Sequence, residues 1–359
     1  MKKPASILVY APSWIGDAVM SLAATRSLAA AYPQVRLAVL ARPWVAELYS
    51  GCEAVNEVLL YDREGVHRGP RGFFRAARKI REQGFDLALL FPNAFRAAAL
   101  VFAAGIPERW GYATDGRGSL LTRPVPPAPR PFGRHQVFYY LDLLRALGVP
   151  AGPPDAGLAL PETLKERARR LLAERGCRPG DRLVGLHPGA TNGPAKRWFT
   201  DRYAALGERF AQSLGARVIV LAGPAETELA AEVAAGVGAP IVLAGTTGLG
   251  DLMGVMGALS VFISNDSGPM HLAAALGVPT IGIFGPTDER ETGPRGRAVR
   301  VVREKVECSP CFLRVCPIDH RCMTRVEVEQ VYQSALELMG VTGRAGPVGL
   351  GGPAFDARP

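Results

Sequence analysis

The sequence lacks the apolar run that a membrane-spanning helix needs, because none of its apolar stretches approaches about eighteen residues. It also lacks a Gly-x-Gly-x-x-Gly fingerprint and the Gly-Lys-Ser/Thr ending of a P-loop. These absences argue against a dinucleotide cofactor held in the usual way and exclude a Walker-type ATPase. We recognise no nucleic-acid-binding motif, and the chain opens on a strand pattern instead of a signal peptide. We therefore expect a cytoplasmic protein with no nucleic-acid partner.

Size and charge narrow the class of protein further. The chain has 359 residues, 48% of them hydrophobic, which exceeds the usual size of one domain and favours two. Its formal net charge of +9 favours acidic partners, such as nucleotide phosphates, nucleic acid or an anionic membrane face. Charge alone does not choose among these partners.

Apolar runs and helical patterns alternate along both halves of the chain. In the first half we expect strands at residues 7–10, 36–40, 58–61 and 87–90, and helices at 18–31, near 45, within 62–82 and at 136–147. In the second half we expect strands at 183–187, 218–222, 240–244, 261–264 and 280–284, and helices at 162–175, 199–214, 226–237, 249–258 and 269–276. Residues 124–129 are predicted to be a proline-rich loop, and residues 148–154 a linker.

This alternation predicts an α/β fold of two Rossmann-like, doubly wound domains that face each other across a cleft. We expect domains at residues 1–150 and 151–340, and a disordered tail at 341–359. Ligands of open α/β sheets bind outside the carboxyl ends of the strands, so functional residues should lie in the turns that follow strands.

The most informative stretch covers residues 261–280, where a buried strand pattern leads through a polar turn into a helix. Asp266 and Ser267 are good N-cap residues, and Gly268 lets a ligand approach the backbone. Pro269 suits the first helical turn, from which His271 would project. Free N–H groups and the helix dipole would face a phosphate. The alternative is that Asp266 merely caps a helix.

The turn after the first predicted strand, Ala11-Pro-Ser-Trp-Ile-Gly-Asp17, places a carboxylate at the carboxyl edge of the first sheet. Asp17 could be a helix N-cap, or a general base that removes a proton from an acceptor hydroxyl. The sequence alone leaves both interpretations open.

The matching turn of the second half is His187-Pro-Gly-Ala-Thr-Asn-Gly-Pro-Ala-Lys-Arg-Trp198. Backbone and hydroxyl groups around Gly189 and Thr191 can hydrogen-bond a phosphate, while the Lys196 ammonium neutralises the charge of a leaving group. The alternative is a solvated Lys196–Arg197 pair. We expect Trp198 to anchor packing and not to stack on a ligand.

Basic residues gather between positions 62 and 82, where they outnumber three acids around Phe73 and Phe74. They are Arg63, Arg68, Arg71, Arg75, Arg78, Lys79 and Arg81. Such a run is typical of a solvated helix face, but a basic face beside an apolar edge also suits attachment to a membrane surface.

Four of the six cysteines, Cys308, Cys311, Cys316 and Cys322, lie within fifteen residues. This spacing could hold a structural zinc through four thiolates, or through three thiolates and His320. The second pair is not a Cys-x-x-Cys, and unligated reduced thiols are the alternative, because a cytosolic compartment disfavours disulfides.

Several spaced motifs, taken in order over residues 7–338, resemble glycosyltransferase family 9, the bacterial lipopolysaccharide heptosyltransferases. The motifs are Pro12-Ser-Trp-Ile-Gly-Asp17, Phe91-Pro-Asn-Ala-Phe-Arg96, Ala104-Gly-Ile-Pro107, Gly193-Pro-Ala-Lys-Arg-Trp198 and Asn265-Asp-Ser-Gly-Pro-Met-His271. The resemblance implies a GT-B fold and an inverting transfer of L-glycero-D-manno-heptose from ADP-heptose to the heptosyl-Kdo-lipid A inner core in lipopolysaccharide biosynthesis. It implies no cofactor for catalysis, and the lack of an Asp-x-Asp metal motif agrees.

The resemblance also implies roles for individual residues. Asp17 would be the general base and Lys196 the phosphate-binding lysine. The donor-binding candidates are Gly189, Thr191, Lys196, Glu226, Thr247, Asp266, Ser267, Gly268 and His271. The acceptor-binding candidates are Ser13, Trp14, Arg42, Arg63, Arg68, Arg71, Asn93 and Arg96. The arginines would meet the phosphates and Kdo carboxylates of the lipid acceptor, at the anionic inner face of the cytoplasmic membrane.

Two other functions stay open. One is a family 9 transferase that uses another acceptor position or another nucleotide-sugar donor. The second is a non-catalytic nucleotide-sugar or lipid-binding protein on the same scaffold, because a fold does not by itself confer activity. The presence of both Asp17 and Lys196 argues against the second. Because these two residues belong to different predicted domains, we expect closure of the cleft to gate catalysis.

Overall fold

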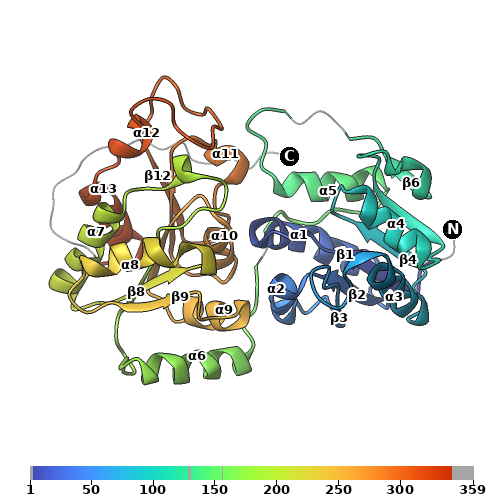
Figure 1. The fold of residues 1–359 in the computed structure, drawn as a ribbon, viewed down its shortest axis with the longest axis horizontal. Helices are drawn as coiled ribbons and strands as arrows, with labels where there is room; N and C mark the ends of the chain where they lie inside the picture. Colours follow the sequence, from blue (N-terminus) through green and yellow to red (C-terminus); the bar gives the residue numbers. More distant parts are fainter. Residues whose placement is uncertain (1–2, 128–130, 156, 342–359) are drawn as a thin grey trace.

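The chain folds around two parallel six-stranded sheets with flanking helices, in a computed structural model that describes residues 3–127, 131–155 and 157–341 (Figure 1). The first sheet has the order β3-β2-β1-β4-β5-β6 and the second the order β12-β11-β10-β7-β8-β9. If β7 is numbered as its first strand and the order is read in the opposite direction, the second sheet has the same strand order as the first. This repeat confirms the predicted α/β fold of two doubly wound halves.

The strands are short and apolar, as expected for strands that are covered on both faces. They are β1 (Ser6–Tyr10), β2 (Arg36–Ala41), β3 (Glu57–Leu60), β4 (Leu87–Leu90), β5 (Glu108–Tyr112), β6 (Arg123–Val125), β7 (Leu183–His187), β8 (Arg217–Ala222), β9 (Ile241–Ala244), β10 (Val261–Asn265), β11 (Thr280–Phe284) and β12 (Val299–Arg303). In the first sheet Val9 lies opposite Val39 and Leu89. In the second, Ile263 lies opposite Leu186. The strand order reverses at β1/β4 and at β7/β10, which places a topological switch point in each half.

Helices and short 3₁₀ turns connect the strands. The α-helices are α1 (Ile15–Ala31), α2 (Pro43–Ala46), α3 (Gly69–Glu82), α4 (Phe95–Ala103), α5 (Val137–Ala146), α6 (Glu162–Glu174), α7 (Thr200–Leu214), α8 (Thr227–Ala235), α9 (Leu249–Gly257), α10 (Gly268–Ala275), α11 (Glu289–Thr292), α12 (Arg321–Thr324) and α13 (Val328–Leu338). The 3₁₀ turns are η1 (Glu47–Gly51), η2 (Arg117–Leu120), η3 (Pro194–Lys196) and η4 (Pro224–Glu226). Among the described residues, no helix is long and apolar enough to cross a membrane.

Two predicted boundaries were wrong in ways that have a physical cause. Helix α1 begins at Ile15, three residues before the predicted start, because the turn that we assigned to residues 11–17 already contains helical residues. Strand β6 forms inside the predicted proline-rich loop, with Pro124 opposite Gly111. Because β6 is an edge strand, the missing N–H of the proline is tolerated. In the predicted tail, residues 342–359 lie outside the described residues.

Helices α1 and α10 form the boundary between the two halves (Figure 1). Helix α1 is buried along most of its length, because it packs against the first sheet and also against α5 and α10. One apolar cluster therefore extends from the first sheet through Leu22 and Leu28 of α1 to Leu272 of α10. The two halves share this core, which fixes the relation between the turns at their facing edges.

Candidate functional site

The N-termini of α1 and α10 meet at the boundary through two glycines. A Cβ atom at Gly268 would lie 3.1 Å from the backbone nitrogen of Gly16 and 3.1 Å from the Ile15 Cβ. A Cβ atom at Gly16 would lie 3.1 Å from the His271 Cδ2. Larger residues would push these helix ends apart, so the glycines bring the turn after β1 against the turn after β10.

Asp17 lies in the first turn of α1, where it is half-buried. The N-cap is Trp14, without a side-chain capping bond, so the interpretation of Asp17 as an N-cap is wrong. The hydroxyl of Tyr140, on α5, donates a hydrogen bond of 2.9 Å to Asp17 Oδ1. Burial, followed by the charge of Asp17, raises the pKa of Tyr140 well above its usual value, so the phenol stays protonated and can donate. A carboxylate in this first turn also faces the positive end of the helix dipole.

Asp266 and Lys196 form a buried ion pair at the switch point of the second sheet. Lys196 Nζ lies 2.6 Å from Asp266 Oδ2, and their side chains are only 15% and 5% exposed. The same oxygen accepts hydrogen bonds from the hydroxyls of Thr287 at 2.8 Å and Thr292 at 3.3 Å. The alternative of a solvated lysine is therefore wrong.

The residue at the N-cap of α10 is Ser267, not Asp266. Ser267 makes no side-chain capping bond, because its hydroxyl lies 2.9 Å from that of Ser264. Ser267 thus occupies the predicted N-cap position without making a side-chain capping bond, and the alternative that Asp266 merely caps the helix is wrong. With no side-chain cap on the first turn, the N–H groups at the start of α10 are the type of group that binds an anion.

Asn265 joins the loop after β7 to the loop after β10, a role that the sequence analysis missed. Its fully buried side-chain oxygen accepts hydrogen bonds from Trp198 N at 2.9 Å and from the Tyr203 hydroxyl at 3.1 Å. Its amide nitrogen donates to the carbonyls of Pro188 at 2.8 Å and Gly189 at 3.3 Å. A polar residue at the end of an otherwise apolar strand was the available signal.

Trp198 is buried, and its indole N–H donates to the Val326 carbonyl at 3.0 Å. The predicted role of Trp198 as a packing anchor is confirmed. The backbone next to Lys196 is also held in place, because the N–H of the preceding residue, Ala195, donates to the Arg314 carbonyl at 3.1 Å. The His320 ring also bonds the Ala195 carbonyl, at 2.7 Å.

The carboxylate of Glu226 lies directly over Gly189, where a Cβ atom would collide with it. His187 Nε2 is 3.8 Å from Glu226 Oε2. Burial lowers the pKa of His187, so its ring is neutral at pH 7. Thr247 lies half-buried after β9 and Thr191 exposed after β7, at separate strand ends. The structure thus brings Gly189 and Glu226 into contact.

His271 is buried on α10 and borders a small cavity between the two halves. The other residues that line the cavity include Met20, His135 and Arg295. The pKa of His271 is lowered to about 4, mainly by burial, while Asp266 opposes this shift and Lys196 contributes to it. The ring is therefore neutral at pH 7.

Three acceptor candidates follow strands β1 and β4. The Ser13 carbonyl accepts a hydrogen bond from the Trp44 indole at 2.7 Å, and Trp14 is 64% exposed. Asn93 Oδ1 accepts a bond of 2.8 Å from the hydroxyl of Tyr139. Because Tyr139 precedes Tyr140 on α5, one turn of this helix contacts both Asn93 and Asp17.

Some of the arginine candidates make hydrogen bonds or ion pairs within the protein, and the others are exposed to solvent. The guanidinium of Arg42 is buried, lies 2.7 Å from Glu64 Oε1 and donates to the Tyr61 carbonyl at 3.3 Å. Arg96 donates to the Tyr61 hydroxyl at 3.1 Å. Arg63, Arg68 and Arg71 are exposed, and only Arg71 lies on α3 itself. An acceptor would therefore reach the exposed arginines without displacing a partner such as Glu64.

The four clustered cysteines are free thiols, two of them exposed. Burial, followed by the other three thiols, raises the pKa of Cys322 to about 11. In the parts of the chain that the structure describes, no group of three or more His, Cys, Asp or Glu side chains is placed to hold a metal ion. Among the described residues, the four thiols are thus not arranged around a common metal position.

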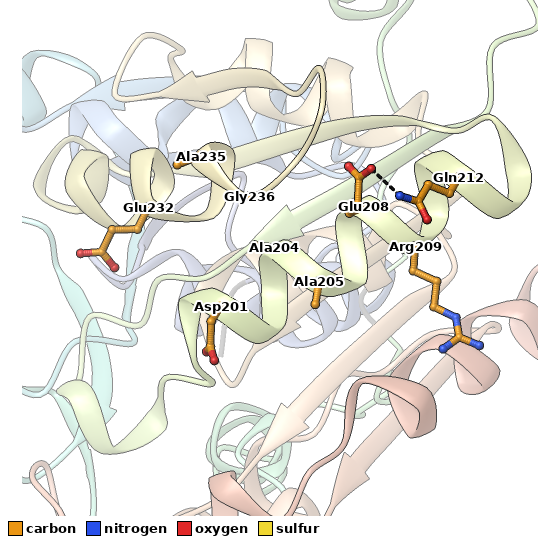
Figure 2. Close-up of a pocket in the computed structure, with 9 residues that line it drawn as sticks. All are labelled: Asp201, Ala204, Ala205, Glu208, Arg209, Gln212, Glu232, Ala235 and Gly236. Carbon is orange, nitrogen blue, oxygen red and sulfur yellow. Dashed lines mark hydrogen bonds between the residues drawn. The ribbon is translucent and has the colours of Figure 1, made fainter.

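A shallow groove between α7 and α8 lies away from this constellation (Figure 2). Its lining includes Asp201, Glu208 and Glu232. None of the predicted site residues lines the groove, so we do not assign the site to it.

Comparisons with known proteins identify the relatives of the chain. Residues 73–321 match the family described as glycosyltransferase family 9 (heptosyltransferase). The chain is 31% identical to lipopolysaccharide heptosyltransferase 2 of Salmonella typhimurium, over 83% of this chain and 87% of that protein. It is 28% identical to lipooligosaccharide heptosyltransferase 2 of Campylobacter jejuni, over 93% and 98% of the two chains. The solved structure of ADP-heptose lipopolysaccharide heptosyltransferase II from Escherichia coli superposes with a TM-score of 0.78 at 28% identity, covering 93% and 98% of the two chains.

Proposed function

The chain belongs to glycosyltransferase family 9, and from this premise we propose that it transfers L-glycero-D-manno-heptose from ADP-heptose to the heptosyl-Kdo-lipid A inner core of lipopolysaccharide. It is a GT-B glycosyltransferase. The observation that carries the proposal is the 31% identity over 83% of the chain to a heptosyltransferase 2. The second-heptose acceptor is favoured over another family 9 acceptor because relatives from several genera share that name.

For the donor, we propose a site at the carboxyl ends of five adjacent strands of the second sheet, which are β9, β8, β7, β10 and β11. Lys196 would neutralise the diphosphate, and the N–H groups at the start of α10 would bind its oxygens. Glu226 would hold the ribose hydroxyls and Thr247 would lie at the adenine edge. A cation and a helix N-terminus can together stabilise the departing ADP in the way that a divalent ion does in other transferases.

For the acceptor, we propose Asp17 as the general base. It would take the proton of a heptose hydroxyl while the oxygen of that hydroxyl forms a bond to the anomeric carbon of the donor. The bond from the anomeric carbon to the diphosphate oxygen breaks at the opposite face, and ADP leaves with the electron pair. Displacement from one face inverts the configuration. The meeting of α1 and α10 at Gly16 and Gly268 supports this arrangement, because it brings the base helix to the donor helix.

We further propose that the enzyme works in the cytoplasm in peripheral contact with the anionic face of the inner membrane. The basic side chains from Arg68 to Arg81 are exposed, and Phe74 and Val66 beside them are 64% and 62% exposed. A basic surface with exposed apolar side chains suits anionic lipid. Cosedimentation with vesicles that contain phosphatidylglycerol should exceed that with phosphatidylcholine alone and should fall in 0.5 M salt, here roughly three times the physiological value. Equal binding to both vesicles would contradict the contact.

The substrate is tested by ADP release from ADP-heptose in the presence of EDTA. We expect turnover with Kdo-lipid A that already bears one heptose, and none with Kdo-lipid A. Turnover only with the unheptosylated acceptor would assign the enzyme to the first heptose instead. Folded protein that releases ADP with neither acceptor would favour another donor or a binding protein.

A structural zinc at the four clustered cysteines stays a prediction from their spacing alone. Metal analysis of the purified protein tests it. We expect about one zinc per chain, lost in the Cys308→Ser/Cys311→Ser variant. Metal-free protein with wild-type turnover would make the zinc prediction untenable. In either case the proposed transfer needs no metal at the reacting atoms.

A further inference from the structure

A hydrogen bond from the Tyr140 hydroxyl joins α5 to the Asp17 carboxylate, and the Tyr140 ring is held firmly in place. The Tyr140 ring packs edge-on against Phe91, with ring centroids 5.2 Å apart, and against Tyr139 at 5.6 Å. The residue is almost completely buried. A ring held on two sides cannot swing its hydroxyl away from Asp17 without disturbing the packing.

The segment that precedes Tyr140 is attached to the second half of the molecule. Gln136 N donates to the Glu291 carbonyl at 2.9 Å. The ring of His135 accepts from Val137 N at Nδ1, so its Nε2 carries the proton and donates to the Gly293 carbonyl at 2.9 Å. These two bonds tie the start of α5 to α11 and to the residue that follows it.

Helix α11 in turn lies beside the donor side of the site. Thr287 and Thr292, which flank it, both donate to the Asp266 oxygen that pairs with Lys196. A continuous series of contacts thus runs from the phosphate-binding candidate Lys196 through α11 and α5 to the Asp17 carboxylate. Neither the donor-binding nor the acceptor-binding candidates include Tyr140.

We propose that Tyr140 is a positioning residue for the transfer, and that its hydroxyl fixes the Asp17 carboxylate while α5 links that orientation to the donor half at α11. This inference rests on the proposed role of Asp17 as the base. Tyr140 touches the base and not the substrate, so it acts through Asp17.

The electrostatic consequence follows from the direction of the hydrogen bond. A donor to a carboxylate favours the ionised form, which is the form that can accept a proton. Other titratable groups around this boundary include Tyr139 and His135 from the α5 segment, His271 from α10 and Arg295 after α11, with the Lys196–Asp266 pair near His271. His271 is neutral at pH 7, so it adds no charge there. Loss of the Tyr140 hydroxyl should therefore shift the ionisation of Asp17 to higher pH.

The test compares Tyr140→Phe with the wild-type chain. We expect kcat/KM at pH 7 to fall about tenfold and the acid limb of its pH profile to move up by about one pH unit, as loss of a hydrogen bond to a charged group predicts. The KM for ADP-heptose should change little. Tyr112→Phe is the matched control, because the Tyr112 hydroxyl donates to the Tyr139 carbonyl of the same helix at 2.8 Å. It should leave the acid limb in place.

A second measurement does not depend on turnover. Carbon-13 NMR of the labelled Asp17 carboxyl carbon should show a titration midpoint about one pH unit higher in Tyr140→Phe than in the wild-type chain. An unchanged midpoint would overturn the inference even if the proposed transfer is correct.

Discussion

Gly16 and Gly268 are in backbone contact across the boundary between the two halves, with space for a hydrogen atom but not for a methyl group. A Cβ atom at Gly268 would lie 3.1 Å from Gly16 N. One glycine belongs to the turn that bears Asp17, and the other to the turn that bears Asp266. The approach of the two turns therefore depends on the smallest residue at both positions.

The change Gly268→Ala tests this contact. The added methyl must displace α1 or α10 by a few tenths of an ångström, so we expect a loss of about 1–3 kcal/mol of unfolding free energy and a fall in kcat. Thermal unfolding and steady-state kinetics measure the two effects. In the control Gly118→Ala the added Cβ would lie 3.6 Å from the Ala113 Cβ, an ordinary contact, and both properties should stay near wild type. Equal behaviour of the two variants would show that the close approach is unimportant.

The change Asp17→Asn should abolish transfer while it leaves ADP affinity nearly intact. An amide cannot accept the proton, and the residue belongs to the first half of the chain, whereas the diphosphate candidates, Lys196 and the start of α10, belong to the second. Turnover assays and calorimetry with ADP measure the two properties. The control Asp201→Asn changes a carboxylate in the outer groove between α7 and α8 and should affect neither. Near wild-type turnover of Asp17→Asn would remove the residue from its assigned role.

The change Lys196→Met should weaken ADP binding and also destabilise the fold. It leaves the Asp266 carboxylate buried without its cation, which costs about 3 kcal/mol in such pairs. The double change Lys196→Met/Asp266→Asn removes that unpaired charge, so stability should largely return while ADP binding stays weak. Urea unfolding and calorimetry separate the two effects. Full recovery of ADP affinity in the double variant would show that Lys196 only stabilises the fold.

Acid should destabilise the protein through His271. The pKa of this buried ring is lowered to about 4 in the folded chain, below about 6.5 in the unfolded chain. Between these values the unfolded chain binds more protons, so the contribution to stability is complete above pH 6.5 and falls as the pH is lowered through the window. The full loss is about 3 kcal/mol.

Urea unfolding at pH 7.5 and pH 5.0 measures the part of this loss that occurs above pH 5.0, about 2 kcal/mol. The variant His271→Gln should lose less stability on acidification than the wild-type chain. Part of the fall should persist, because burial also lowers the pKa of His187. An identical fall in both proteins would contradict the assignment to His271.

The alternating pattern predicted the two doubly wound halves because parallel strands covered on both faces are apolar throughout. The strands around Val9 and Ile263 are clear examples. Helices α4 and α13, the short helices α11 and α12, and strands β5, β6 and β12 were missed. Strand β5, for example, contains Glu108 and Arg109 and therefore lacks a continuous apolar run. Strand β6 contains a proline, which is tolerated only at an edge.

Most candidate residues were found because each follows a strand, a position that the sequence pattern reveals. Their partners were not predicted, because hydrogen bonds between distant segments leave no local signal. Tyr140 is 123 positions from Asp17, and Asp266 is 70 from Lys196. Asn265 was quoted within a motif, but its role in joining two loops depends on the backbone geometry of both.

The first sheet draws all of its strands from residues 6–125, and this has a consequence for synthesis of the chain on the ribosome. The sheet can form before β7 has been made, because domains generally fold as units from the N-terminus. The face of α1 that contacts α10 stays uncovered until residue 275 has emerged. A nascent chain therefore presents this face, which includes Val19 and Met20 beside the position of His271, to solvent while about 150 residues after the first sheet are added, at roughly 5–20 residues per second. We expect chains truncated before α10 to aggregate or to bind chaperones.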